Sequence, residues 1–281
     1  MSLADIQTKN NIDYFTGTPI QMRLVSRFAA RMLIFLCLLV AGQTAHAEEK
    51  LTIAAAADLK FALDEIVVLF KSTHPAAQIE TIYGSSGQFS TQIRQGAPYD
   101  LYFSADIAYP RALKAEGFAA SEVQTYGVGR IVLWSQSRDI TKLSLADLTD
   151  PSIRKIAIAN STHAPYGKRA EEALKAAGVW EKVEPKLVYG ENIAQTAQFV
   201  QTGNAQVGII ALSLAISPEL AKQGGYALIP DKLHQPLEQG FIITKRAADN
   251  SLAREFAGFM ASKTARTIMA RYGFVLPGES K

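Results

Sequence analysis

The chain has 281 residues, a formal net charge of +3 and a single cysteine. Its 29 lysine and arginine residues are nearly balanced by 26 aspartate and glutamate residues, and no basic run is interleaved with aromatic residues. This composition does not indicate a nucleic-acid-binding protein. A lone cysteine excludes an internal disulfide, so stability has to come from one or two hydrophobic cores, which a chain of this length can bury.

The N-terminal stretch has the order of a secretory signal peptide. Three arginines (Arg23, Arg27 and Arg31) precede an apolar run at 32–40, and small residues then end in Ala-His-Ala. This order predicts cleavage after Ala47, export to the periplasm and a nearly neutral mature chain that begins at residue 48. Met22 is a plausible true start, and Cys37 leaves with the leader. The apolar run is too short to span a membrane, although a retained anchor remains an alternative.

From residue 51 onward, short apolar runs alternate with amphipathic patterns, which predicts an α/β fold with largely parallel sheets. The first helix begins at Asp58, which is a good N-cap. Glycines follow two later helices, at Gly117 and Gly178, as expected for helix C-termini. The predicted strands are 51–56, 77–83, 99–106, 129–135, 154–160, 185–190, 205–212 and 239–245. The predicted helices are 58–72, 89–96, 107–117, 162–178, 191–203, 250–262 and 263–273.

The strand–helix units form two sets, which favours two lobes over one continuous sheet. We expect the chain to cross between lobes near 126–130 and again near 236–240. The first lobe then consists of residues 48–127 and 238–281, and the second of residues 128–237. On this reading the two C-terminal helices return to the first lobe.

Four strand-to-helix junctions are rich in small or hydroxyl residues: "AADL", "GSSG", "APYG" and "GENIA". A helix N-terminus presents unpaired backbone N–H groups and a partial positive charge, so each junction could receive an anion. Two junctions fall in each predicted lobe. Together they favour an anion site made of neutral donors.

The stretch "YGSSGQ" could instead be a serine nucleophile on a sharp turn. Such a turn needs glycines two residues either side of the serine, but Ser86 has Gly84 before it and Gln88 after it. No histidine has a sequence neighbour that would orient it, and no cluster has metal-ligand spacing. We therefore expect Ser85 and Ser86 to donate hydrogen bonds. The histidines concerned are His74, His163 and His234.

Five segments together resemble the periplasmic molybdate-binding proteins of ABC importers. They are "AAAADL", "YGSSGQFSTQIRQGAPYDLYFSAD", "IANSTHAPYG", "YGENIAQTAQFVQTGNAQVGIIAL" and "RYGFVLP". The resemblance implies a type II periplasmic-binding-protein fold, an α/β fold with two mixed sheets flanked by helices and a ligand cleft between the lobes. It also implies a monomeric receptor that binds molybdate or tungstate and delivers it to a membrane permease, with no catalysis, no cofactor and no separate metal-ion site.

Two alternatives remain open. One is a receptor for another ligand, such as sulfate, phosphate or a small organic acid. The other is an enzyme on the same two-lobed scaffold, which would need a nucleophile and a base paired within the four loops. We expect no such pair.

Carried over residue by residue, the resemblance implies four contacts with the oxyanion. They are the hydroxyl of Ser86, the backbone N–H groups of Tyr166 and Ile193, and a first-loop contact at Asp58. Ser85 then caps or braces its turn. Some relatives add a tyrosine hydroxyl where this chain has Ala211, so that donor is missing here.

Asp58 is the difficult position, because a carboxylate facing a dianion is repelled. In the favoured arrangement its side chain turns away and caps its own helix at Lys60 or Phe61, which makes affinity nearly flat from about pH 6 to 8. In the other arrangement it takes up a proton and donates it to the anion, which ties affinity to pH.

Overall fold

The structure is a computed structural model that describes residues 50–278. The predicted leader, its cleavage site and Cys37 lie outside these residues. Among the residues described, no helix is long and apolar enough to span a bilayer.

The first of two sheets has the strand order β2-β1-β3-β10-β4. β1 pairs in parallel with β2 and β3, whereas β10 runs antiparallel to β3 and β4. The sheet is therefore mixed, and its last two strands come from distant parts of the chain. The bounds are β1 Lys50–Ala56, β2 Gln78–Gly84, β3 Leu101–Ser104, β4 Gln124–Gly129 and β10 Leu237–Ile243.

The second sheet has the order β7-β6-β8-β5-β9 and is mixed as well. β6 pairs in parallel with β7 and β8, and β5 runs antiparallel to β8 and β9. The bounds are β5 Ile131–Ser135, β6 Ile156–Ala159, β7 Leu187–Gly190, β8 Val207–Ala211 and β9 Gly225–Leu228. β4 and β9 are absent from the predicted strands, because glycines interrupt β4 and β9 is a short, half-exposed edge strand.

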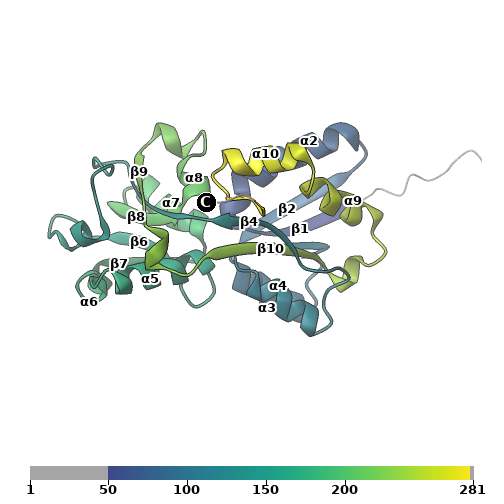
Figure 1. Ribbon diagram of the computed structural model, residues 1–281, viewed down its shortest axis with the longest axis horizontal. Helices are drawn as coiled ribbons and strands as arrows, with labels where there is room; N and C mark the ends of the chain where they lie inside the picture. The colour runs from purple at the N-terminus through teal and green to yellow at the C-terminus, as the bar shows by residue number, and fades with distance from the viewer. Residues whose placement is uncertain (1–49, 279–281) are drawn as a thin grey trace, which may run out of the picture. The chain divides into compact units, whose positions relative to one another are not determined.

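Helices cover both faces of the first sheet (Figure 1). Alternate residues of β1 point to opposite faces. Leu51 and Ile53 pack under α2, α9 and α10, whereas Ala54 packs with Phe89 of α3 and Leu113 of α4. The bounds are α2 Lys60–Thr73, α3 Ser86–Arg94, α4 Ala108–Ala115, α9 Ser251–Met260 and α10 Lys263–Arg271. We call this sheet and its helices the first lobe.

The second lobe consists of the other sheet with α5, α6, α7 and α8 (Figure 1). Its apolar core continues into the first lobe through Ala56, Ala57 and Ala105. Small residues at these strand ends let the lobes approach closely. The bounds are α5 Pro165–Ala176, α6 Trp180–Val183, α7 Ile193–Gln201 and α8 Leu212–Ala215.

The chain passes from β4 of the first sheet to β5 of the second through Arg130 alone, and returns between β9 and β10. β4 and β10 are neighbours in the first sheet and pair from Leu237 with Gly129 to Phe241 with Gln124. Both connections between the lobes therefore join the first sheet at adjacent strands. The predicted glycine ends of two helices are confirmed, since Gly117 and Gly178 have φ values of 81° and 67°.

Candidate functional site

Four residues predicted to contact an anion line one small cavity. Asp58 and Ser86 reach it from the first lobe, and Tyr166 and Ile193 from the second. The cavity volume is about 10 Å³. Its other lining residues are Ala56, Ala57, Gly84, Ser85, Ala105, Ala164 and Pro165. The structure thus brings the predicted residues together, while their contact with a ligand stays a prediction.

The adjacent serines Ser85 and Ser86 make different hydrogen bonds. α3 begins at Ser86, three residues earlier than predicted, and Ser85 is its N-cap, with Oγ accepting from the Gln88 N–H at 3.4 Å. Ser86 is fully buried, and its Oγ accepts from the Ala105 N–H at 3.0 Å. A hydroxyl that accepts one hydrogen bond still has a hydrogen to donate. Ser86 is therefore held in place with its donor function left for a ligand.

Tyr166 lies in the first turn of α5. Pro165 occupies the start of the helix, where its missing N–H costs no hydrogen bond. A Cβ at Gly167 would overlap the carbonyl oxygen of Ala159, so only glycine allows this turn to press against the end of β6. The Tyr166 N–H is one of the first-turn groups that have no partner within the helix.

The N-terminus of α7 brings Ile193 to the cavity. Asn192 is the N-cap, and its Oδ1 accepts from the N–H groups of Ala194 and Gln195 at 3.0 Å each. This cap uses the second and third N–H groups of the helix. Ile193, the first residue of α7, precedes them and lines the cavity, and its N–H is not used by this cap.

Asp58 does not cap its helix, so the favoured arrangement is wrong. A 3-10 turn at Ala57–Leu59 precedes α2, and neither has a side-chain cap. The Asp58 carboxyl instead faces the second lobe. Its Oδ2 accepts from the Tyr166 hydroxyl at 2.9 Å and from Gln239 Nε2 at 3.0 Å. These partners hold the side chain inward, away from Lys60 and Phe61.

Gln239 of β10 and Tyr126 of β4 extend this buried network. The Tyr126 hydroxyl donates to Gln239 Oε1 at 2.7 Å, and Gln239 Nε2 donates to the Tyr166 hydroxyl at 3.0 Å. Sequence reasoning missed both residues. The available signal was a glutamine at the start of the apolar run "GFIIT", because a buried amide requires partners.

Burial raises the pKa of Asp58 to about 7, although hydrogen bonds from Gln239 and Tyr166 and the nearby backbone N–H groups of Asp58 and Leu59 lower it. No basic side chain is among these main contributions. Burial also holds the pKa values of Tyr126 and Tyr166 well above 10, so both phenols stay neutral.

His163 has partners that the sequence did not reveal. Its Nδ1 lies 2.9 Å from Ser85 Oγ, and its Nε2 lies 3.4 Å from Glu191 Oε2. The expectation that no serine–histidine pair occurs in the four loops is therefore wrong. However, Ser85 is only 3% exposed and its side chain caps α3, in a cavity without room for an organic substrate. Because Ser85 and His163 belong to different lobes, their contact joins the lobes.

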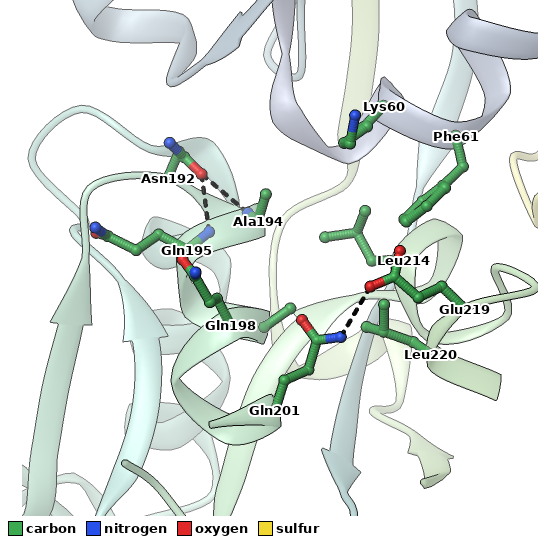
Figure 2. Close-up of a pocket in the computed structure, with 11 residues that line it drawn as sticks. Lys60, Phe61, Asn192, Ala194, Gln195, Gln198, Gln201, Leu214, Glu219 and Leu220 are labelled. Carbon is green, nitrogen blue, oxygen red and sulfur yellow. Dashed lines mark hydrogen bonds between the residues drawn. The ribbon is translucent and has the colours of Figure 1, made fainter. Parts of the chain in front are cut away.

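An open groove of about 420 Å³ also lies between the lobes (Figure 2). Lys60 and Phe61 of α2 face the side chains of α7 across it, and Gln201 hydrogen-bonds to Glu219 on its floor. Lys60 Nζ is paired with Asp64. With an acidic group and neutral amides in its lining, the groove suits an anion less well than the small cavity does. Within 50–278, no three or more histidine, cysteine, aspartate or glutamate side chains are grouped so that they could hold a metal ion.

A family model described as bacterial extracellular solute-binding protein matches residues 51–275. The chain belongs to this family. The chain is also similar to the molybdate-binding protein ModA of Rhodobacter capsulatus, with 38% identity over 79% of this chain and 86% of the relative. ModA of Azotobacter vinelandii is 32% identical over 80% of this chain and 89% of the relative.

A solved structure described as the Azotobacter vinelandii periplasmic molybdate-binding protein superposes on this solute-binding protein with a TM-score of 0.76. The two are 30% identical, and the match covers 81% of this chain and 99% of the other. These relatives confirm the resemblance and the two-lobed fold with two mixed sheets. Members of the family bind solutes and are not enzymes, so this chain is not an enzyme either.

Proposed function

We propose that this protein binds molybdate or tungstate and delivers it to the membrane permease of an ABC importer. The observation that supports this best is the meeting of three helix N-termini, those of α3, α5 and α7, at a cavity of about 10 Å³. A space of this size holds about one water molecule, so an oxyanion requires the lobes to separate slightly and an organic ligand requires much more room. The names of the relatives point to the same ligand class.

The donors around the cavity are neutral. The hydroxyl of Ser86 and the first-turn N–H groups of Tyr166 and Ile193 point partial positive charge at the cavity without a lysine or arginine in its lining. Hydrogen bonds to a charged partner contribute about 1.5–3 kcal/mol each. Three such bonds give roughly 5–9 kcal/mol before the costs of closure. Micromolar binding corresponds to about 8 kcal/mol, so neutral donors reach this range when further first-turn N–H groups of the three helices also take part.

The protein is expected to select between oxyanions because the hydrogen-bond donors around the cavity have fixed positions. The donors are fixed by Ala105, Asn192 and the packing of Gly167, so they cannot close onto a smaller tetrahedron. Sulfate is smaller than molybdate and is expected to bind more weakly.

The proposed function places the mature protein in the periplasm. The signal-like stretch at 22–47 supports export to the periplasm with cleavage after Ala47. The predicted lobe boundaries, 48–127 with 238–281 and 128–237, lie within two residues of the end of β4 and the start of β10. A monomer without affinity for nucleic acid fits the nearly neutral mature chain.

A thermal-shift experiment tests the proposal. A ligand that binds only the folded state at a hundred times its dissociation constant adds about 2.7 kcal/mol to the free energy of unfolding. Molybdate and tungstate are expected to raise the melting temperature of residues 48–281, and sulfate at equal concentration is not. Equal shifts with all three ions contradict selection by size.

A further inference from the structure

One oxygen of a buried carboxyl in the cavity has no partner. Asp58 is 1% exposed, and its Oδ1 makes no hydrogen bond within the described part of the chain. Asp58 also lines the cavity. A buried polar atom without a partner carries a cost that the fold normally avoids. A ligand oxygen in the cavity would supply the missing partner.

The surrounding network decides which oxygen carries a proton. Tyr126 donates to Gln239 Oε1, which turns Nε2 toward Asp58. Tyr166 donates to the same Asp58 oxygen, Oδ2. With two donors already directed at Oδ2, a proton on this carboxyl belongs on Oδ1.

The side chains that face Asp58 carry no positive charge. α5 contributes the neutral phenol of Tyr166 and β4 that of Tyr126, while β10 contributes the amide of Gln239. From α8, the Ser213 hydroxyl donates to the backbone carbonyl of Asp58 at 2.8 Å. No basic side chain lines the cavity. A dianion arriving beside Asp58 would raise its pKa further, because like charges disfavour ionisation.

We propose that Asp58 and the oxyanion share one hydrogen between Oδ1 and an anion oxygen, so that the site takes up a proton together with the anion. This inference rests on the proposed function. The proton comes from solvent: the ionised carboxylate, one proton and the dianion combine into one complex. The carboxyl thereby becomes a donor like the serine and the backbone groups around it.

The pH dependence follows from the sign of this uptake. Below the pKa of Asp58 in the free protein, the proton is already in place and affinity is flat. Above it, each anion has to bring a proton, so affinity falls by up to about tenfold per pH unit. Burial places the start of this decline near pH 7. This is the opposite of the flat profile expected for a capping aspartate.

Calorimetric titration of molybdate tests the inference. Measured at about pH 6.5 to 9 in two buffers of different ionisation enthalpy, wild-type protein is expected to take up close to one proton per anion at the alkaline end. Asp58→Asn places an N–H donor at the same position. It is expected to bind molybdate with no proton uptake and little pH dependence. Asp64→Asn, an exposed carboxyl of α2, is the matched control and should keep the wild-type slope.

A second variant, Tyr166→Phe, tests the protonation of the Asp58 carboxyl independently. Tyr166→Phe removes a hydrogen bond that lowers the pKa of Asp58, so the decline in affinity should begin at higher pH. Molybdate binding by wild-type protein without proton uptake, or a slope that persists in Asp58→Asn, overturns the inference and leaves the proposed function standing. Absence of molybdate binding at every pH refutes the proposed function, and the inference with it.

Discussion

Ser85 and Ser86 are adjacent, yet their hydroxyls have different surroundings. Ser85 caps α3 and touches His163, whereas Ser86 accepts from Ala105 and keeps its hydrogen for the cavity. The sequence predicted the cap at Ser85 correctly, and the contact of Ser86 with an anion stays a prediction. The sequence could not predict the hydrogen bonds of the Asp58 side chain. Their donors, in α5 and β10, lie 108 and 181 residues further along the chain.

Ser86→Ala is expected to weaken molybdate binding by about ten- to a hundredfold, the equivalent of one hydrogen bond to a charged group. Ser85→Ala removes a helix cap worth about 1 kcal/mol of stability and should affect binding less. Equilibrium titration of both variants makes the comparison. A larger loss of affinity in Ser85→Ala means that the predicted contact is one residue out of register.

Asp58 also links stability to pH in the absence of a ligand. Its pKa rises from 3.8 to about 7 on folding, so the folded form holds its proton where the unfolded form has lost it. Wild-type protein should therefore lose stability relative to Asp58→Asn as pH rises from about 4 to about 7, by an amount on the order of 4 kcal/mol at most, and the difference should then level off. Urea unfolding across this range measures it. A difference that does not change with pH contradicts a buried, protonated carboxyl.

Among elements, the helix N-termini carry the site. Sequence patterns placed the starts of α5 and α7 three and two residues early, at 162 and 191. The pattern placed the start of α3 three residues late, because "SSG" reads as a loop until the cap at Ser85 is seen. β4 escaped prediction because its glycines and exposed start weaken the apolar signal, although it carries Tyr126.

The N-cap of α7, Asn192, allows a test of whether this helix N-terminus contributes to anion binding. Asn192→Ala should cost about 1 kcal/mol of stability and also weaken molybdate binding several-fold, since the Ile193 N–H loses its fixed direction. Asn250→Ala removes the equivalent cap of α9, which accepts from the Ala253 N–H away from the cavity. Its stability should fall by a similar amount with affinity unchanged. Equal affinities in the two variants contradict a role for the α7 N-terminus.

Across the whole molecule, contacts between the lobes surround the cavity. Ser85 meets His163, Gln88 Nε2 donates to Glu191 Oε2 at 3.0 Å, and Asp106 lies 3.5 Å from Arg169. Sequence reasoning predicted two lobes but none of these pairs, because each joins residues more than sixty positions apart. They stabilise the closed arrangement in which Asp58 is buried.

His163→Ala should therefore speed release of the anion. Losing one hydrogen bond between the lobes costs about 0.5–1.5 kcal/mol, which corresponds to roughly a two- to tenfold increase in the dissociation rate. The Gly87 N–H still donates to the backbone carbonyl of residue 163 at 2.9 Å, so the local fold should persist. Stopped-flow displacement of molybdate by tungstate measures the rate. An unchanged rate means that the imidazole contact does not hold the lobes together.

The measurement that bears most directly on the account is a calorimetric titration of molybdate, tungstate and sulfate into residues 48–281 at neutral pH. Neutral donors of fixed spacing around one cavity predict one anion per chain, micromolar or tighter affinity for molybdate and tungstate, and sulfate binding weaker by at least about a hundredfold, which is about 2.7 kcal/mol. Sulfate binding as tight as molybdate, or no heat from any of the three ions, would contradict it.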